Sequence, residues 1–305
     1  DGYMSLNLTT SNKPLGITLS LLEVICTIII ASLVKLIAGD LSVLMVLFFR
    51  YLFCIPLLMI TAIQQRKYNA LKINSKFGLI IRTLTGIGSF GCLFAALQFI
   101  DLSLMTILLQ TMPLFVVLLA PIIIKEFVGW FRSFLALFGF IGVMLILNPI
   151  EKDWVNFGIV LGIFSPFFGA VMTIFVRRLG KTDHPATTAL WYNMFAALIF
   201  LLVCLIFEIK WPDFNQTLII LTVIGLVSSL QQICLAYSLK FAPASLLAPL
   251  RYVSVPIGIL VGVFYFNENL SINFFLGTSI IVFSSLIIIR QETKKNSNRF
   301  IKKFK

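Results

Sequence analysis

Long apolar segments constrain this chain more than any other feature. Charged and turn-forming residues divide the sequence into ten segments of about 20 mostly apolar residues. A helix rises about 1.5 Å per residue, so each segment can cross a hydrocarbon layer that is roughly 30 Å thick. The predicted spans are 15–37, 42–63, 77–99, 103–123, 131–148, 155–177, 186–208, 217–239, 243–265 and 273–290.

The composition excludes a water-soluble fold. The chain is 59% hydrophobic and only 12% charged, whereas a soluble domain is about 25% charged. Segments such as 280–289 are apolar on every face, unlike the alternating strands of an outer-membrane barrel. The sequence therefore predicts an all-α polytopic protein of the cytoplasmic membrane, with ten transmembrane helices.

Basic residues indicate how the helices are oriented. When the loops are assigned alternately to two sides, 18 Lys and Arg fall on one side and 3 on the other. Because cytoplasmic loops are rich in Lys and Arg, both termini are predicted to be cytoplasmic: residues 1–14, and a basic tail at 291–305 that can contact anionic lipid. The net charge of +12 is thus a topology signal, and no nucleic-acid partner is expected. Residues 1–3 precede Met4, are expected to be an expression remnant, and enter no argument.

The two halves of the sequence resemble each other at one offset of 142 residues. The matched pairs include Lys35 with Arg177, Leu97 with Leu239, Ser103 with Ser245, and Glu126 with Glu268. They define two repeats, 15–148 and 155–290, with five predicted spans each. Five is odd, so the second repeat enters the membrane from the opposite face. Inverted repeats around a central site are typical of secondary transporters.

Three charged residues lie deep inside predicted spans and have no charged counterpart at this offset: Glu23, Arg50 and Arg251. A charge at the membrane centre costs at least about 2.5–3.5 kcal/mol, so each should be paired or face water. Glu23 could simply form a packing salt bridge with one arginine. Alternatively, the three line a polar cavity for a cargo with a carboxylate or another anionic group, which arginine binds with its planar fork. Glu23 is also a candidate coupling-proton site.

Other polar, aromatic and proline residues complete the candidate site. Further lining candidates are Tyr51, Gln110, Trp191, Tyr192, Gln231 and Tyr252. Pro113 and Pro256 lie within the fourth and ninth spans, where proline bends a helix; they are either static kinks or gating hinges. Arg82 is expected at the interface, with its side chain reaching toward water.

Signals for enzymatic chemistry are missing from the sequence. The five cysteines show no metal or redox spacing, and His184 is the only histidine. No GxxxxGK[ST] phosphate loop is present, so ATP does not drive this chain directly. We therefore expect no catalytic residue, metal or cofactor.

The overall pattern resembles the EamA-type members of the drug/metabolite transporter superfamily. The motifs that carry the resemblance are Phe48–Tyr51, Ala242–Ala244, Ala248–Tyr252 and Phe266–Glu268. The resemblance covers about residues 15 to 290. It implies a central cavity formed mainly by helices one, three, four, six, eight and nine, which would place Glu23, Gln110, Gln231 and Arg251 near it and Arg50 more peripherally. The sequence of residues 248–252, Ala-Pro-Leu-Arg-Tyr, is similar to that of S-adenosylmethionine uptake members of the family.

Together these features predict a secondary transporter of a small organic metabolite that works by alternating access. The preferred cargo is an amino acid or an amino-acid derivative such as S-adenosylmethionine. Efflux of amphipathic drug-like compounds is the alternative, and a membrane-embedded enzyme or a channel is less favoured. The expected partners are the substrate and the lipid bilayer. Coupling to protons or a counter-substrate, and a homodimer, are left open.

Overall fold

The computed structural model describes residues 13–66, 71–123, 130–147, 157–179, 182–212, 216–241 and 247–303. These residues form helices, and their only strand-like feature is an isolated bridge between Ala38 and Leu41. The elements are α1 (Lys13–Leu36), α2 (Val43–Arg66), α3 (Lys76–Ala96), α4 (Leu102–Leu109), α5 (Met112–Ile123), α6 (Trp130–Leu147), α7 (Phe157–Leu179), α8 (Pro185–Ile206), α9 (Gln216–Phe241), the 3-10 helix η2 (Ala248–Val253), α11 (Ser254–Phe266) and α12 (Ile272–Lys303).

Within the described residues, every predicted span coincides with one helix or with two consecutive helices. Residues 148, 155–156 and 243–246 of the predicted spans lie outside the described residues. Within the described residues, seven helices are long and apolar enough to cross a membrane, judged by length and composition. Three more are apolar but shorter: Ser133–Ile146, Leu250–Phe266 and Ile272–Ile288. The all-helical class is therefore confirmed, whereas the count of ten spans and their sidedness stay predictions.

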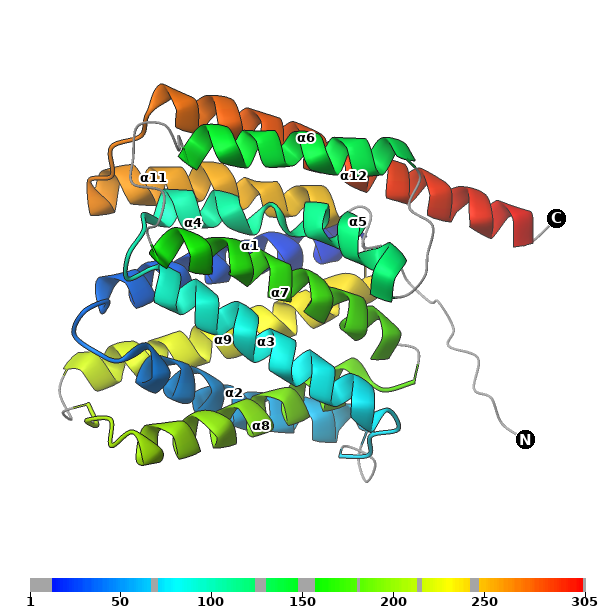
Figure 1. The fold of residues 1–305 in the computed structure, drawn as a ribbon. Helices are drawn as coiled ribbons and strands as arrows, with labels where there is room; N and C mark the ends of the chain where they lie inside the picture. Colours follow the sequence, from blue (N-terminus) through cyan, green and yellow to red (C-terminus); the bar gives the residue numbers. More distant parts are fainter. Residues whose placement is uncertain are drawn as a thin grey trace, which may run out of the picture.

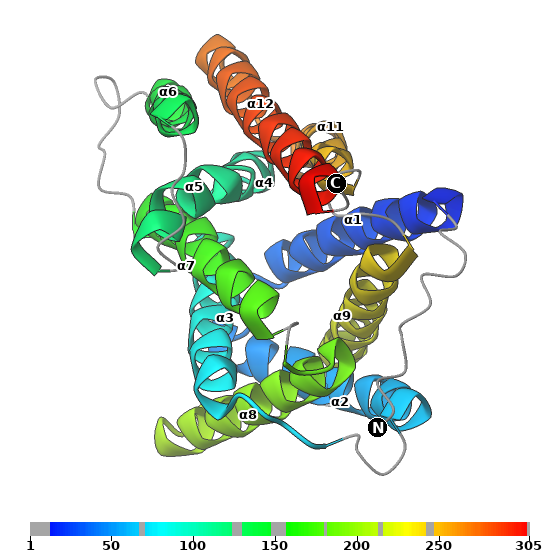
Figure 2. The same ribbon diagram turned by 90° about the vertical axis from the view of Figure 1, so that its right-hand side faces the viewer.

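Helices that are distant in sequence pack in pairs. α3 packs along α7, α1 along α9, α2 along α8, and α6 along α12. In Figure 1, α6 and α12 lie along the upper edge of the bundle, and α2 and α8 along the lower edge. Figure 2 shows α1 with α9 on one side, and α3 with α7 on the other, between these two edges. Each pair joins a helix before residue 148 to one after residue 156, so the interface between the halves runs through the whole bundle.

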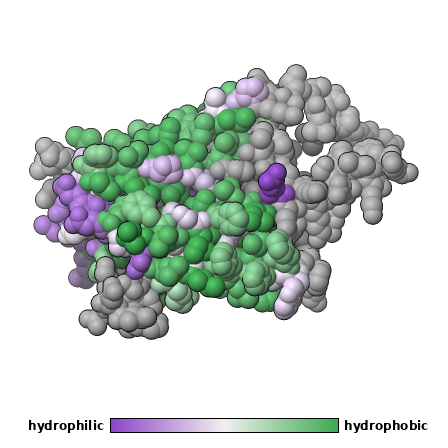
Figure 3. Space-filling model, turned by 90° about the horizontal axis from the view of Figure 1, so that it is seen from above, coloured by the Kyte–Doolittle hydropathy of each residue, from purple (hydrophilic) through white to green (hydrophobic). Residues whose placement is uncertain are grey.

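The outer surface of the bundle is apolar. Trp130, Phe264 and Ile272 are among its most exposed side chains. Figure 3 shows a face that is mostly hydrophobic, with polar residues gathered at one end. Large exposed apolar patches are rare on soluble monomers, so this surface fits a lipid environment.

Two predicted spans are interrupted by breaks in the helix. Segment 103–123 consists of α4 and α5, which are separated at Gln110 and Thr111. Segment 243–265 contains the tighter helix η2 before α11 begins at Ser254. The two breaks are equivalent in the repeat, because Gln110 and Tyr252 are 142 residues apart.

A proline follows each break. Pro113 is the second residue of α5, and Pro256 is the third residue of α11. Proline has no backbone N–H, so the carbonyl four residues earlier loses its helical partner. The affected carbonyls belong to Leu109 and Tyr252, which lie at the two breaks. The predicted kinks are thus observed as interruptions, and their role in gating stays a prediction.

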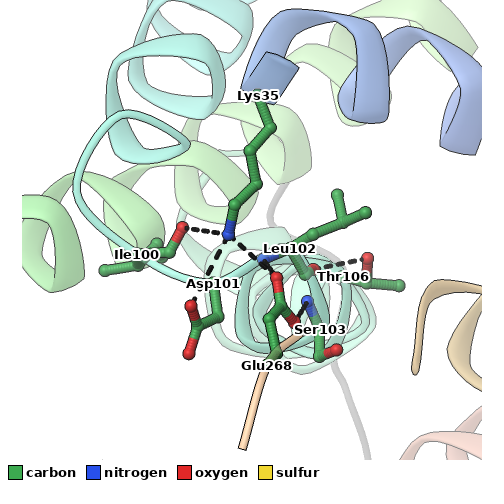
Figure 4. A network of polar contacts seen from close by, with 7 residues as sticks. All are labelled: Lys35, Ile100, Asp101, Leu102, Ser103, Thr106 and Glu268. Carbon is green, nitrogen blue, oxygen red and sulfur yellow. Dashed lines mark hydrogen bonds and ion pairs between the residues drawn. The ribbon is translucent and has the colours of Figure 1, made fainter. Parts of the chain in front are cut away.

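One carboxylate ties helix ends together at the loop after α11 (Figure 4). Glu268 accepts the backbone N–H of Leu102 at 2.6 Å and that of Ser103 at 3.0 Å. These are the first N–H groups of α4, which have no partner inside their own helix. Lys35, in the last turn of α1, donates to the same carboxylate at 2.8 Å and to the carbonyl of Ile100 at 3.3 Å. Glu268 therefore joins α11 of the second half to α1 and α4 of the first.

The local sequence aims this carboxylate at α4. Asn267 adopts the left-handed conformation, with φ 54°, and ends α11. The chain then turns back, and the N–H of Glu268 donates to the carbonyl of Gly262 at 3.0 Å, a common way to end a helix. A Cβ at Gly262 would collide with the carboxylate of Glu268 and the hydroxyl of Ser103, so glycine is needed here.

The hydrogen bonds around Glu268 change its pKa. Burial disfavours the charged carboxylate, but the hydrogen bonds from Lys35, Ser103 and Leu102 outweigh burial and hold the pKa of Glu268 below its ordinary value of 4.5. The pKa is therefore lower in the folded chain than in the unfolded chain. This carboxylate then stabilises the fold fully above the ordinary value, and its contribution is lost as the pH falls through the folded value.

We predict that Glu268→Gln lowers the free energy of unfolding at pH 7 by on the order of 2 kcal/mol, because charge-assisted hydrogen bonds are lost. The difference from wild type should shrink as the pH falls below 4.5, because the wild-type carboxylate then becomes protonated too. Thermal unfolding of purified protein in detergent, followed across pH, measures both effects. Glu208→Gln, at an exposed carboxyl after α8, is the control. A deficit that does not change with pH would contradict the assignment.

A second prediction concerns the crossing of α6 and α12. A Cβ at Gly142 would lie 2.7 Å from the carbonyl oxygen of Gly277, and a Cβ at Gly277 would meet the carbonyl of Gly142. Small residues allow such close backbone approach in membrane helices. Gly277→Ala should therefore destabilise the protein by about 1–3 kcal/mol through overpacking. Gly91→Ala is the matched control, because a Cβ there meets nothing within 4 Å. Equal thermal stability of the two variants would argue against this contact.

Candidate functional site

The carboxyl group of Glu23 lies between α1 and α9. The residue is 7% exposed. Gln231 of α9 donates from Nε2 to Glu23 Oε1 at 3.4 Å and to the hydroxyl of Thr27 at 3.1 Å. The hydroxyl of Thr27 lies 3.5 Å from the same carboxyl oxygen. Glu23 and Gln231, both predicted as site residues, are thus brought together from opposite halves of the chain.

No basic residue in the described part of the chain forms an ion pair with Glu23. Both ion pairs within the described ranges belong to Lys35, so neither Arg50 nor Arg251 pairs with this carboxyl. The packing salt bridge considered from the sequence is therefore not formed. The neutral amide and hydroxyl can hydrogen-bond to the carboxyl but leave any negative charge uncompensated, which is unfavourable in an apolar interior. A cationic group placed at this position would compensate such a charge.

Arg50 of α2 lies in an aromatic cage. Its side chain is fully buried. The guanidinium carbon lies 3.7 Å from the ring centre of Phe90, 4.8 Å from that of Tyr51 and 5.7 Å from that of Phe94. Such cation–π contacts contribute up to about 2 kcal/mol each when desolvated. Arg50 is among the most deeply buried of the described residues, and its expected place at the periphery of the central cavity stays a prediction.

The cage compensates part of the charge of Arg50 and leaves most of its hydrogen-bonding groups unused. None of the three guanidinium nitrogens makes a well-aligned hydrogen bond within the described part of the chain, although the side chain of Tyr192 is a hydrogen-bonding neighbour of the guanidinium. The groups that act on Arg50 electrostatically are Tyr51, Tyr192 and Cys54, none of which is a carboxylate. A buried ion without a counter-ion carries a penalty of several kcal/mol, so the aromatic contacts offset this penalty only in part.

Tyr192 of α8 lies between two guanidinium groups. It is repeat-equivalent to Arg50, and its hydroxyl is 2.9 Å from that of Tyr51. The guanidinium of Arg82 lies 5.6 Å from the ring centre of Tyr192 on α8. A Cβ at Gly86 would lie 2.7 Å from this ring, so glycine makes room for it. Arg82 is half-buried. Its Nε is buried without a hydrogen-bond partner among the described residues, and its guanidinium faces an aromatic ring of the bundle. That the end of the side chain reaches water stays a prediction.

The two helix breaks also contact each other. The side chain of Gln110, at the end of α4, donates from Nε2 to the hydroxyl of Ser254, the first residue of α11, at 2.7 Å. Ser285 of α12 donates to the backbone carbonyl of Gln110 at 3.3 Å. This carbonyl lies where α4 ends and has no continuing helix to bond to. Tyr252, in the tight turn η2, is 8% exposed. Polar groups from three helices therefore surround the paired breaks.

Two predicted site residues lie outside the contacts around Glu23, the cage around Arg50 and the paired helix breaks. The indole Nε1 of Trp191 donates to the carbonyl of Leu71 at 2.9 Å, and its ring stacks on Phe195. This places Trp191 beside the loop before α3. Arg251 is exposed on η2, and it forms no ion pair with Glu23.

Sequence reasoning did not find several residues of these clusters. They are Thr27, Phe90, Phe94, Ser254 and Ser285. Thr27 follows Glu23 by four residues and so shares its helix face, a signal that was present. The others are common residue types, and only the packing of distant helices distinguishes them. Among the described residues, no group of three or more His, Cys, Asp and Glu could hold a metal ion.

Comparison with known proteins agrees with this architecture. The EamA-like transporter family matches the chain twice, at residues 14–148 and 156–290. The chain is 31% identical to a riboflavin transporter of Vibrio cholerae over 62% of this chain and 63% of that protein. It is 27% identical to an S-adenosylmethionine uptake transporter of Rickettsia prowazekii over 83% of this chain and 85% of that protein.

A solved crystal structure shares the fold with a TM-score of 0.61 at 15% identity, covering 88% of this chain and 94% of the other. With its many apolar helices and its bacterial transporter relatives, the chain is a multi-pass protein of the bacterial inner membrane. Because the family pattern accounts for both halves of the sequence, the chain belongs to the EamA-like transporter family.

Proposed function

We propose that this protein is a secondary transporter that moves a small organic metabolite across the cytoplasmic membrane by alternating access. The observation that carries the proposal is the uncompensated carboxyl of Glu23, which meets Gln231 across the interface between α1 and α9. These helices belong to different halves of the chain. A group at such an interface is exposed to one side or the other as the halves move.

The arrangement of the bundle supports ten spans in two inverted repeats, 15–148 and 155–290. The offset of 142 residues makes α1 equivalent to α7, α3 to α9, α2 to α8, and α6 to α12. The packed pair α1–α9 is therefore equivalent to the packed pair α7–α3, and each of the pairs α2–α8 and α6–α12 joins two equivalent helices. This is the pairing expected of two halves related by a two-fold axis. The double family match supports the same division.

We propose that the substrate site comprises Glu23 and Gln231 together with the paired helix breaks at Gln110 and Tyr252. Discontinuous helices expose polar backbone groups inside the membrane and commonly form transporter sites. Pro113 and Pro256 keep these breaks open, because they cannot restore the missing hydrogen bonds. We infer that the breaks act as hinges. Trp191, Tyr192 and Arg251 stay predictions as lining residues.

The cargo we propose is an amino acid or an amino-acid derivative such as S-adenosylmethionine. One of the relatives matched over most of both chains carries that name, and the sequence of residues 248–252 favours the same group. A carboxyl at Glu23 can meet a cationic part of such a cargo, or bind a proton that couples to its transport.

Flux through purified protein in liposomes tests the proposal. Labelled S-adenosylmethionine, amino acids and riboflavin are offered outside the vesicles, with or without the same compound inside. A carrier predicts faster uptake when unlabelled compound is present inside. Glu23→Gln should lower this flux by about tenfold or more, the loss expected when a charged hydrogen-bonding partner is removed.

Glu208→Gln, which changes an exposed carboxyl outside the site, is the matched control and should transport like wild type. Uptake that does not respond to compound inside the vesicle would indicate a channel. Wild-type flux in both Glu23→Gln and Arg251→Ala would rule out the central site.

The proposed orientation is tested with reporter fusions. An enzyme that is active only in the cytoplasm should be active when fused after Lys305, because both termini are predicted to be cytoplasmic. The same enzyme should be inactive when fused after Lys210, which lies on the predicted outer side. The reverse pattern would overturn the orientation derived from the basic residues.

A further inference from the structure

We propose that Arg50 binds a carboxylate group of the cargo, in the cage formed by α2, α3 and α8. The inference rests on the proposed transporter function and adds a chemical requirement to it, namely that the cargo is a carboxylic acid or an amino acid. It also separates two binding elements. Glu23 lies between α1 and α9, and Arg50 lies among α2, α3 and α8.

The geometry of the cage leaves the hydrogen-bonding edge of Arg50 free. The ring of Phe90 lies 3.7 Å from the guanidinium carbon, so it is in contact with the guanidinium itself. A cation–π contact uses the positive charge and no N–H group. The five N–H donors of a guanidinium lie in its own plane, and none of the three nitrogens makes a well-aligned hydrogen bond among the described residues. The side chain of Tyr192 is a hydrogen-bonding neighbour of this group, but one hydroxyl can accept only a minority of the five donors.

A carboxylate matches this unused edge. Its two oxygens accept two parallel N–H bonds from a guanidinium, which is a strong and directional contact. Among the described residues, the groups that act on Arg50 are two tyrosines and a cysteine, and none of them is a carboxylate. The carboxyl of Glu23 bonds to Thr27 and Gln231 and forms no ion pair with Arg50.

The tyrosine pair offers a further donor. The hydroxyls of Tyr51 and Tyr192 are 2.9 Å apart, and in such a pair only one hydroxyl donates to the other. The accepting hydroxyl keeps its own proton, which can be donated to an anion. Arg82, on the neighbouring helix α3, also faces the ring of Tyr192. Two cations and a free hydroxyl proton therefore surround a region whose described neighbours include no acidic side chain.

Matched ligand pairs test this assignment in purified wild-type protein. The probes are the natural amino acids, each compared with its methyl ester, and S-adenosylmethionine, compared with its decarboxylated form. Dissociation constants come from the ligand-dependent shift of thermal unfolding. We expect at least one carboxylate probe to bind about tenfold or more tightly than its partner that lacks the carboxylate.

Two substitutions then assign the preference to Arg50. Arg50→Lys keeps the charge but lacks the planar fork, and Arg50→Gln removes the charge. Both should lose most of the preference for the carboxylate, while affinity for the partner without it changes little. Arg178→Gln, at an exposed arginine near the end of α7, should behave like wild type. Tyr192→Phe, which keeps the ring and removes a hydroxyl, should weaken carboxylate binding a few-fold.

The outcomes separate this inference from the proposed function. Three results would overturn the assignment to Arg50 and leave it as a packing residue. They are equal binding of both members of each ligand pair to wild type, no binding of any carboxylate probe, and an unchanged carboxylate preference in the Arg50 variants that fold. If neither Arg50 variant folds, the wild-type comparison and Tyr192→Phe still decide. Carrier flux of riboflavin without any carboxylate preference would support the transporter and reject this site. Carboxylate binding without flux would support the Arg50 site and reject the transporter function.

Discussion

The absence of water inside a membrane governs this structure, because every backbone polar group must find its partner within the protein. Within a helix, most backbone N–H and C=O groups hydrogen-bond to each other. Where a helix ends or breaks, a side chain from a distant segment supplies the missing bond. Ser285 bonds to the open carbonyl of Gln110, and Glu268 accepts the open N–H groups of Leu102 and Ser103. The bonds that repair helix ends are therefore also the bonds that hold the two halves together.

The same constraint distinguishes the proposed binding groups from the groups that only join helices. Lys35 and Glu268 neutralise each other, and their role is to join helix ends. Glu23 and Arg50 are both buried, yet neither has a charged partner within the described ranges. Their surroundings differ in kind, since Glu23 meets neutral polar groups and Arg50 meets aromatic rings. A transporter must bind and release its cargo, so binding groups that wait without a permanent partner fit that task.

The repeat explains why particular residues meet, although the sequence could not say so directly. α2 and α8 occupy equivalent places in the two halves and pack against each other. Residues at equivalent positions on such a pair come close together, and Arg50 and Tyr192 are one such pair. If both positions held arginine, the two charges would repel. Because one position holds arginine and the other tyrosine, a cation and an aromatic side chain can pack side by side there. Trp191, one residue earlier, lies on another face and bonds to the loop at Leu71.

The sequence by itself determined the helical class, the approximate spans, the internal repeat and the short set of intramembrane charges, because hydrophobic length, charge and spacing are local properties of the chain. It also placed prolines where two spans are interrupted. Only the tertiary structure decided which residues meet. Glu23 pairs with Gln231 but not with an arginine, Arg50 enters an aromatic cage, and Glu268 bonds to α4. These contacts depend on how helices far apart in sequence cross, and periodicity within one helix carries no information about the partner that it will face.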